Sequence, residues 1–401
     1  MPDPTPQDLQ AANAYARRAI LSRAVEMTTR VFNTTFTAGV GVNISQVQPV
    51  INVQPRNVGL IKGFWVEAFA TLTNGSAVQI NRADFAPSSL LSGIAYVDLQ
   101  NNTRINTTGR HLSTINSIRH KRPFCAAYNI GAFESTSTAP SKMGDNFVIN
   151  SAPATIAAGA SGTIRMFYYV PLAYAHDDLR GAVYANVLQA TQQLNFTPNP
   201  VPVVANGTDS TSALYVGNAA GSVALAVLSS LTLNVYQEYY DQLPVVNGSV
   251  LLPPMDLGTI YELKNTSLTA IQANQEFPIP YANLRDFLSV SVTYVNTAAT
   301  GARTAGADIN YWALQAANAT NIWLKDPSLC AAQLRNHLET DLPLGQYYFP
   351  SRMKPIATTQ YGNMQIVLNA SLAGVGAYVL LGFEDFSYLN TIRLGGSLAA
   401  N

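Results

Sequence analysis

The chain contains 401 residues, which is more than one hydrophobic core usually organises, so the length predicts two domains of roughly 150–200 residues each. Apolar residues make up 48% of the chain and charged residues only 11%, and the formal net charge is zero. This balance excludes a protein that coats nucleic acid through a net positive surface, and it leaves little electrostatic repulsion between copies packed side by side.

The two cysteines, Cys125 and Cys330, lie far apart in the chain and in no Cys/His metal spacing. We expect both to be packed, reduced thiols, as suits a protein synthesised in a reducing cytoplasm. The first residues, MPDPTP, have no basic segment followed by an apolar one, so we expect no secretory signal. The apolar stretches near residues 223–235 and 370–383 are shorter than a membrane-spanning helix requires.

Residues 8–32 are predicted to form one long amphipathic helix, because their first half is rich in alanine and their apolar residues partly follow a helical period. Four basic residues lie between residues 17 and 30 with only Glu26 opposing them: Arg17, Arg18, Arg23 and Arg30. A basic amphipathic helix at a terminus is typical of contact with an anionic membrane surface. An arm that packs on its own domain or on a neighbouring chain is the alternative, and the residues leave both open.

After residue 32 the pattern changes to short strands rich in β-branched and aromatic residues. The alternation is clearest at 287–295, where Leu288, Val290 and Val292 share one face. Strands at this spacing, without alternating helices, predict an all-β fold of sandwiches or barrels. The predicted strands are 36–53, 58–72, 90–99, 163–170, 222–236, 287–295, 364–368 and 377–386.

Two short helices are predicted in loops, at 177–187 and 328–340. A proline-rich stretch with an Asn-Gly turn at 243–255 indicates a short, stiff connector between the domains. The expected organisation is an N-terminal helical arm, a first domain, a connector, a second domain and a C-terminal tail, at 1–34, 35–243, 244–254, 255–388 and 389–401.

No catalytic, cofactor or metal motif is present: the sequence has no GxSxG, no HExxH and no phosphate-binding loop. The chain is therefore predicted not to be an enzyme and to need no cofactor. His176, Asp177 and Asp178 form the cluster that most resembles a cation site. A helix N-terminal cap with an acidic first turn is the interpretation that we prefer for these residues.

Between residues 104 and 122 there are five Lys or Arg residues and no acid: Arg104, Arg110, Arg119, Lys121 and Arg122. Such a stretch suits a patch for phosphate or for an acidic neighbour. The preferred interpretation is a solvated basic loop or an intersubunit contact. Aromatic residues interleaved for base stacking are missing, so sequence-specific nucleic-acid binding is not expected.

Several segments, in order along most of the chain, resemble the major capsid proteins of tectiviruses, the tailless icosahedral bacteriophages with an internal membrane. The segments are NVGLIKGF at 57–64, APATIAAGA at 152–160, MFYYVPLAY at 166–174, DLRGAV at 178–183, VYQEYYDQLP at 235–244, YANL at 281–284, DINY at 308–311 and QYGN at 360–363. The similarity weakens in the N-terminal arm, at 191–221 and after residue 387.

The resemblance implies a tandem double jelly-roll, two eight-stranded β-barrels, carrying the N-terminal helix and short helices in loops. It implies a structural virion protein that forms homotrimers of pseudo-hexagonal outline. These trimers would tile an icosahedral shell around an internal membrane vesicle and the genome. The implied partners are neighbouring trimers, vertex, minor or cement capsid proteins, and the membrane, which the N-terminal helix would face.

Two other classes of protein remain as alternatives. One is a minor or vertex capsid subunit of the same architecture. The other is an extracellular β-sandwich adhesin or carbohydrate-binding protein, for which we expect a secretory signal and an exposed aromatic binding face. Trp312 and Trp323 are the residues that would form such a face, and we interpret them as core residues.

Overall fold

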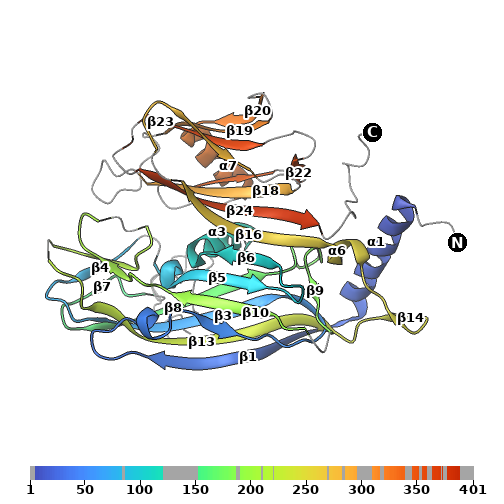
Figure 1. The fold of residues 1–401 in the computed structure, drawn as a ribbon, viewed down its shortest axis with the longest axis horizontal. Helices are drawn as coiled ribbons and strands as arrows, with labels where there is room; N and C mark the ends of the chain where they lie inside the picture. The colour runs from blue at the N-terminus through green and yellow to red at the C-terminus, as the bar shows by residue number, and fades with distance from the viewer. Residues whose placement is uncertain are drawn as a thin grey trace, which may run out of the picture.

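The computed structural model describes residues 5–83, 86–120, 152–186, 190–208, 211–219, 221–268, 271–281, 285–295, 309–316, 320–338, 346–351, 355–358, 364–371, 373 and 377–388. These residues form two β-rich domains stacked on one another, with one helix at the edge near the N-terminus (Figure 1). The prediction of an all-β fold with few helices is confirmed.

The first domain is a pair of facing sheets with a hydrophobic core between them. One sheet contains β1 (Val25–Thr37), β13 (Ala226–Asp241), β3 (Leu60–Asn74), β8 (Ser161–Pro171) and β9 (Val183–Tyr184). The other contains β2 (Ile51–Val53), β10 (Gln193–Pro198), β5 (Leu91–Val97) and β6 (Thr103–Thr107). Buried residues alternate along β3 at Phe64, Val66 and Ala68, which is the period of a strand with one face in a core.

The second domain repeats this arrangement around its own core. Its inner sheet contains β16 (Thr259–Leu268), β24 (Tyr378–Tyr388), β18 (Asp286–Val295), β21 (Gln346–Pro350) and β22 (Ile356–Ala357). Its outer sheet contains β17 (Glu276–Pro280), β23 (Gln365–Ala370), β19 (Ile309–Ala316) and β20 (Thr320–Lys325). Trp312 is fully buried, and Trp323 is half-buried and stacks on Phe349 with ring centroids 4.8 Å apart.

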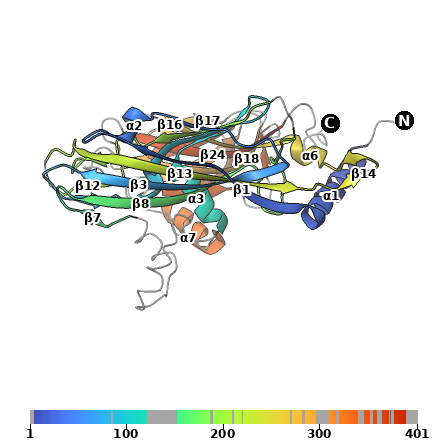
Figure 2. The same cartoon turned by 90° about the horizontal axis from the view of Figure 1, so that it is seen from below.

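The smaller elements close the ends of the two domains. The strands β11 (Val203–Val204), β12 (Tyr215–Gly217), β4 (Ile80–Arg82) and β7 (Thr155–Ile156) form a small sheet, and β14 (Val245–Val246) pairs with β15 (Ser249–Val250) in a hairpin. The helical elements are α1 (Pro6–Arg23), α2 (Ile44–Val47), η1 (Ser88–Leu90), α3 (Gly109–His120), α6 (Pro254–Leu257) and α7 (Pro327–Leu338). Figure 2 shows α3 and α7 protruding on the same side of the molecule.

The first-domain sheet that contains β6 is continuous with the inner sheet of the second domain. We call the first of these the inner sheet of the first domain. Strand β6 of the first domain pairs in parallel with β16 of the second, with Ile105 opposite Leu263 and Asn106 opposite Lys264. Within the described residues, one sheet of nine strands therefore crosses both domains. We call this junction, together with the side chains packed around it, the seam.

Two predicted helices differ from the structure. The N-terminal helix ends at Arg23 rather than at residue 32, because residues 25–37 form β1. This strand pairs with β13, with Val25 opposite Asp241 and Thr37 opposite Ser230. Valine and threonine dominate this stretch and favour a strand once a partner strand is present. Residues 177–186 form a turn followed by β9 and residue 187 lies outside the described residues, whereas the helix predicted at 328–340 is confirmed as α7. Among the described residues, no helix combines the length and apolarity needed to cross a bilayer.

Candidate functional site

Helix α1 is held at its start by a capping box and along one face by apolar contacts. The Asp8 N–H donates to Thr5 Oγ1 at 3.3 Å, and the Asp8 carboxylate accepts from the Thr5 N–H at 3.1 Å. The Thr5 hydroxyl also donates to the Asp8 carboxylate at 2.6 Å, and this bond, followed by the one from the Thr5 N–H, holds the pKa of Asp8 below its usual value. Ile20 is fully buried in a cluster with Leu60, Leu179 and Tyr240 of the first domain.

A buried carboxylate fixes this helix to α6, directly after the connector between the domains. Asp256 of α6 is 1% exposed and accepts from Arg17 Nε at 2.7 Å and from Asn13 Nδ2 at 3.0 Å. The Asn13 side-chain oxygen accepts in turn from the backbone N–H groups of Met255 and Asp256, at 2.9 and 3.1 Å. The bond to Asp256 raises the pKa of Arg17. Arg17, predicted to face a membrane, therefore lies on the face of α1 that docks on its own subunit.

The remaining basic residues of the arm are exposed. Arg18 and Arg23 lie on the outward face of α1, and Arg30 lies further along, on β1. Helix α1 also exposes Tyr15, and the neighbouring β14–β15 hairpin exposes three valines (Figures 1 and 2). We call this mixed cationic and apolar area the base surface; it consists of Tyr15, Arg18, Arg23, Val245, Val246 and Val250, whose apolar members are 40–60% exposed.

A polar network lies in the seam, around the buried imidazole of His111. Thr107 Oγ1 donates to Asn265 Oδ1 at 2.8 Å, so the single hydroxyl hydrogen is used there. The 2.6 Å contact between Thr107 Oγ1 and His111 Nδ1 must then be a bond donated by Nδ1–H. Asn265 Nδ2 donates to Thr108 Oγ1 at 3.0 Å. This network joins β6, α3 and β16, and therefore both domains.

His111 has no room or polar partner for a second proton. Its Nε2 is buried without a hydrogen bond in the described part of the chain. A Cβ added at Gly382 of β24 would lie 2.5 Å from Cγ of the ring, so the strand passes the imidazole at a distance that only glycine permits. Burial lowers the pKa of His111 to about 4, with Arg110 also lowering it and Glu384 opposing the shift.

Aromatic side chains pack the other end of the seam. Tyr174 of the first domain contacts Tyr261 and Phe386 of the second, with ring centroids 5.9 and 5.2 Å apart. The Arg180 guanidinium lies 4.5 Å from the Phe386 ring centroid and pairs with Asp178 at 2.9 Å. Asp178 is also 3.8 Å from Arg17, so the seam and the docked helix share a carboxylate.

The predicted basic loop at 104–122 is not one surface patch. Arg104 is 4% exposed on β6, where Nε donates to Asp98 Oδ2 at 2.6 Å and Nη1 donates to the Gly181 carbonyl at 2.8 Å. Arg110 lies on α3 and donates to the Thr211 carbonyl at 3.1 Å. The side chain of Arg119, and Lys121 and Arg122 entirely, lie outside the described residues.

Two residues of the candidate cation cluster have other partners, one through a hydrogen bond with a lysine and one through an ion pair. His176 Nδ1 lies 3.0 Å from Nζ of the buried Lys62, and Asp178 pairs with Arg180. Within the described residues, no three His, Cys, Asp or Glu side chains are arranged to hold a metal ion. Cys330 is a buried free thiol whose pKa burial raises to about 12, whereas Cys125 lies outside the described residues.

We expect Arg17→Ala to destabilise the protein by about 3 kcal/mol, because it leaves the buried Asp256 carboxylate without its cation. The matched variant Arg18→Ala removes an exposed arginine from the next position and should cost less than about 0.5 kcal/mol. Calorimetric melting and limited proteolysis of the N-terminal arm measure both effects. Equal melting temperatures for the two variants would contradict a docking role for Arg17.

Acid should weaken the seam through His111. Its folded pKa of about 4 lies below the ordinary value of 6.5, so only the unfolded chain binds a proton between these values. This contribution to stability is full above pH 6.5 and is lost as the pH falls towards 4, by about 3 kcal/mol in total.

The measurement is the melting temperature as a function of pH. The variant His111→Gln cannot titrate and should flatten the profile between pH 4 and 6.5. The matched variant His176→Gln changes a side chain that is 73% exposed and should keep the wild-type slope. An unchanged slope in His111→Gln would show that another group dominates the acid response.

Comparisons with known proteins agree with this geometry along nearly the whole chain. The family described as P3 major capsid protein N-terminal matches residues 5–243, and P3 major capsid protein C-terminal matches residues 258–398. The chain is 36% identical over 396 residues to the major capsid protein P3 of Enterobacteria phage PRD1, covering 98% of this chain and 95% of that protein.

Solved capsid structures share the fold at low sequence identity. The crystal structure of the STIV MCP matches with a TM-score of 0.60 and 9% identity, over 92% of this chain and 99% of that chain. The atomic structure of Sulfolobus Turreted Icosahedral Virus gives 0.62 and 11%, over 94% and 95%. The PBCV-1 virus capsid gives 0.52 and 11%, over 90% and 94%. The resemblance to tectivirus capsid proteins is confirmed, and the chain belongs to the P3 major capsid protein family as a structural double jelly-roll protein of the virus capsid, not an enzyme.

Proposed function

We propose that this capsid protein assembles as homotrimers of pseudo-hexagonal outline, which tile an icosahedral shell around an internal membrane vesicle and the genome. The continuous inner sheet supports the trimer, because it holds the two jelly-rolls of one chain side by side as a fixed pair. Three such pairs provide six similar bodies around a closed threefold axis. Neighbouring trimers and vertex, minor or cement proteins are the further partners of this shell.

The membrane side of the shell is the base surface. Arg18 and Arg23 supply two exposed positive charges, and the β14–β15 hairpin supplies exposed valines next to them. Cations attract anionic headgroups, and apolar side chains gain by entering the interface. Helix α1 is too polar to cross a bilayer and is anchored to its own subunit through Arg17 and Asp256. The proposal is therefore surface contact, with Arg30 on β1 as an additional basic residue.

The trimer is tested by the solution mass of the purified protein. Size exclusion with light scattering should give three times the chain mass of 43.0 kDa, stable on dilution, because a capsid building block needs large and obligate interfaces. A monomer at micromolar concentration would contradict the proposal.

Membrane contact is tested by sedimentation of these oligomers with anionic phosphatidylglycerol vesicles. The double variant Arg18→Glu, Arg23→Glu should bind at least about tenfold more weakly, since each basic residue near an anionic surface contributes about 1 kcal/mol. Raised salt should weaken wild-type binding in the same direction. Substitution of Val245 and Val246 by serine should remove the part of the binding that persists at high salt.

Lys325→Glu is the control, because it makes the charge change of one of these two substitutions on β20, far from α1 (Figure 1). It should bind vesicles like the wild type. Undiminished binding by the double arginine variant, or an equal loss in Lys325→Glu, would show that the base surface is not the contact. Each variant is first checked for its mass, so that failure of assembly and failure of membrane contact remain distinguishable.

A further inference from the structure

The seam joins two particular strands of the repeated fold. In chain order, the eight strands of the first jelly-roll are β1, β2, β3, β5, β6, β8, β10 and β13, and those of the second are β16, β17, β18, β19, β20, β21, β23 and β24. Each set forms two sheets in the same spatial order, 1-8-3-6 and 2-7-4-5. The seam pairs the fifth strand of the first jelly-roll, β6, with the first strand of the second, β16. The equivalent strands outside the seam are therefore β20, the fifth of the second jelly-roll, and β1, the first of the first.

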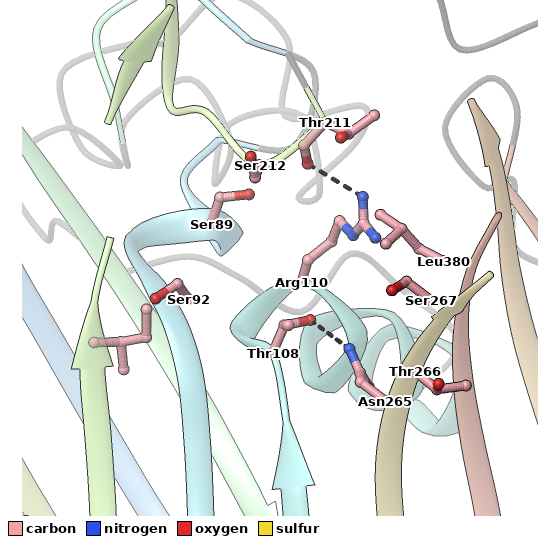
Figure 3. A pocket seen from close by; sticks show the side chains of 11 residues that line it. Ser89, Ser92, Thr108, Arg110, Thr211, Ser212, Asn265, Thr266, Ser267 and Leu380 are labelled. Atoms are coloured by element: carbon pink, nitrogen blue, oxygen red, sulfur yellow. Dashed lines mark hydrogen bonds between the residues drawn. The ribbon is translucent and has the colours of Figure 1, made fainter. Parts of the chain in front are cut away.

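Pairing at the seam buries the strands that it joins. Ile105 of β6 lies opposite Leu263 of β16, and both side chains are 0% exposed. Side chains add to the backbone contact: Asn265 Nδ2 donates to Thr108 Oγ1 at 3.0 Å across the junction, beside a cavity of about 310 Å³ that both domains line (Figure 3). An edge strand of one jelly-roll thus binds the edge of another along a closely packed contact.

The equivalent strands β1 and β20 are open by comparison. Within the described residues, β1 pairs with β13 alone and β20 with β19 alone, and no described side chain of either strand is buried. Val25 and Met27 on β1 are 41% and 38% exposed, and Leu324 on β20 is 50% exposed. An open edge of 13 residues, rich in valine and threonine, is a template for a further strand, and exposed apolar side chains beside it gain by burial.

The two open edges face in opposite directions. Figure 1 shows β1 at the bottom of the two stacked domains and β20 at the top. Contact between these unlike edges of successive copies is heterologous, and such contacts form a closed ring when the rotation between copies closes. The seam strands are parallel, and rotation about an axis along the strands preserves their direction. A parallel contact of this kind is therefore one that a threefold axis can repeat.

We propose that β20 of one copy lies along the edge of β1 of the next copy and parallel to it, as β6 lies along β16 within the chain. This contact rests on the proposed homotrimer and names the strands that form its interface. Leu324 of one copy is then buried beside the exposed apolar side chains of β1 of the next, Val25 and Met27. Three seams within the chains alternate with three such contacts between them, so that six jelly-rolls close a ring.

The first test is cross-linking of the full-length double variant Met27→Cys, Leu324→Cys with a short bis-maleimide, which joins exposed thiols. The background is Cys125→Ser, and Cys330 is buried. The two new thiols lie on strands at opposite ends of one chain, so a link between them joins separate copies (Figure 1). Denaturing electrophoresis should show species of two and three times the chain mass of 43.0 kDa. Each single variant should stay unlinked, because like edges do not meet; linked dimers of either would overturn the head-to-tail contact.

The second test is the stability of the trimer on dilution, followed by light scattering. Leu324→Asp places a charge in the contact and should raise the concentration at which the trimer dissociates at least about tenfold. Val201→Asp makes the same kind of change at a residue that is 52% exposed, between β10 and β11, and should behave like the wild type. A wild-type trimer that neither cross-links nor responds to Leu324→Asp would overturn this contact and leave the trimer standing. A monomeric wild type would overturn both.

Discussion

The parallel pairing of β6 with β16 is the constraint on which the rest of the molecule depends. Without it, each jelly-roll would end in a sheet edge with unpaired backbone groups, and such edges promote uncontrolled association. When the two edges pair, their backbone hydrogen-bonding groups bind one another, and the pairing fixes the register between the domains. That register places Gly382 against the His111 ring and Asn265 beside Thr107. The contacts of the seam are consequences of this one alignment.

Charge is used sparingly in this protein, and several of its charges stabilise internal contacts. Arg104 pairs with Asp98, Lys62 with Glu26, and Arg285 with Glu262, and in each pair at least one member is less than 9% exposed. Removing one partner of such a pair leaves an uncompensated buried charge, so a single substitution in a pair destabilises the fold. Serine, threonine and asparagine then supply much of the surface. A surface of this kind packs against copies of itself without long-range repulsion.

Local signals in the sequence were sufficient where the structure is locally determined. Helix α7 begins at a proline and has apolar residues at helical spacing, and the alternation of Leu288, Val290 and Val292 predicted the strand β18. Local signals failed where a distant partner decides. Residues 25–32 continue an alanine-rich helix, but Met27 pairs with Tyr239, and this pairing makes them a strand. Arg104 resembled a surface residue because the Gly181 carbonyl that helps to bury it comes from another loop. The seam cavity needs residues from two domains and has no sequence signature.

The anchoring of α1 by Asp256 also orders events in time. Synthesis proceeds towards the C-terminus, so α1 leaves the ribosome well before its carboxylate partner, which lies 239 residues later. Strand β1 likewise has no partner strand until β13 has been synthesised. The arm therefore has no final position until the first domain and the connector have been made. A nascent chain carries an undocked arm, and the basic helix reaches its place on the capsid subunit only when the fold behind it is complete.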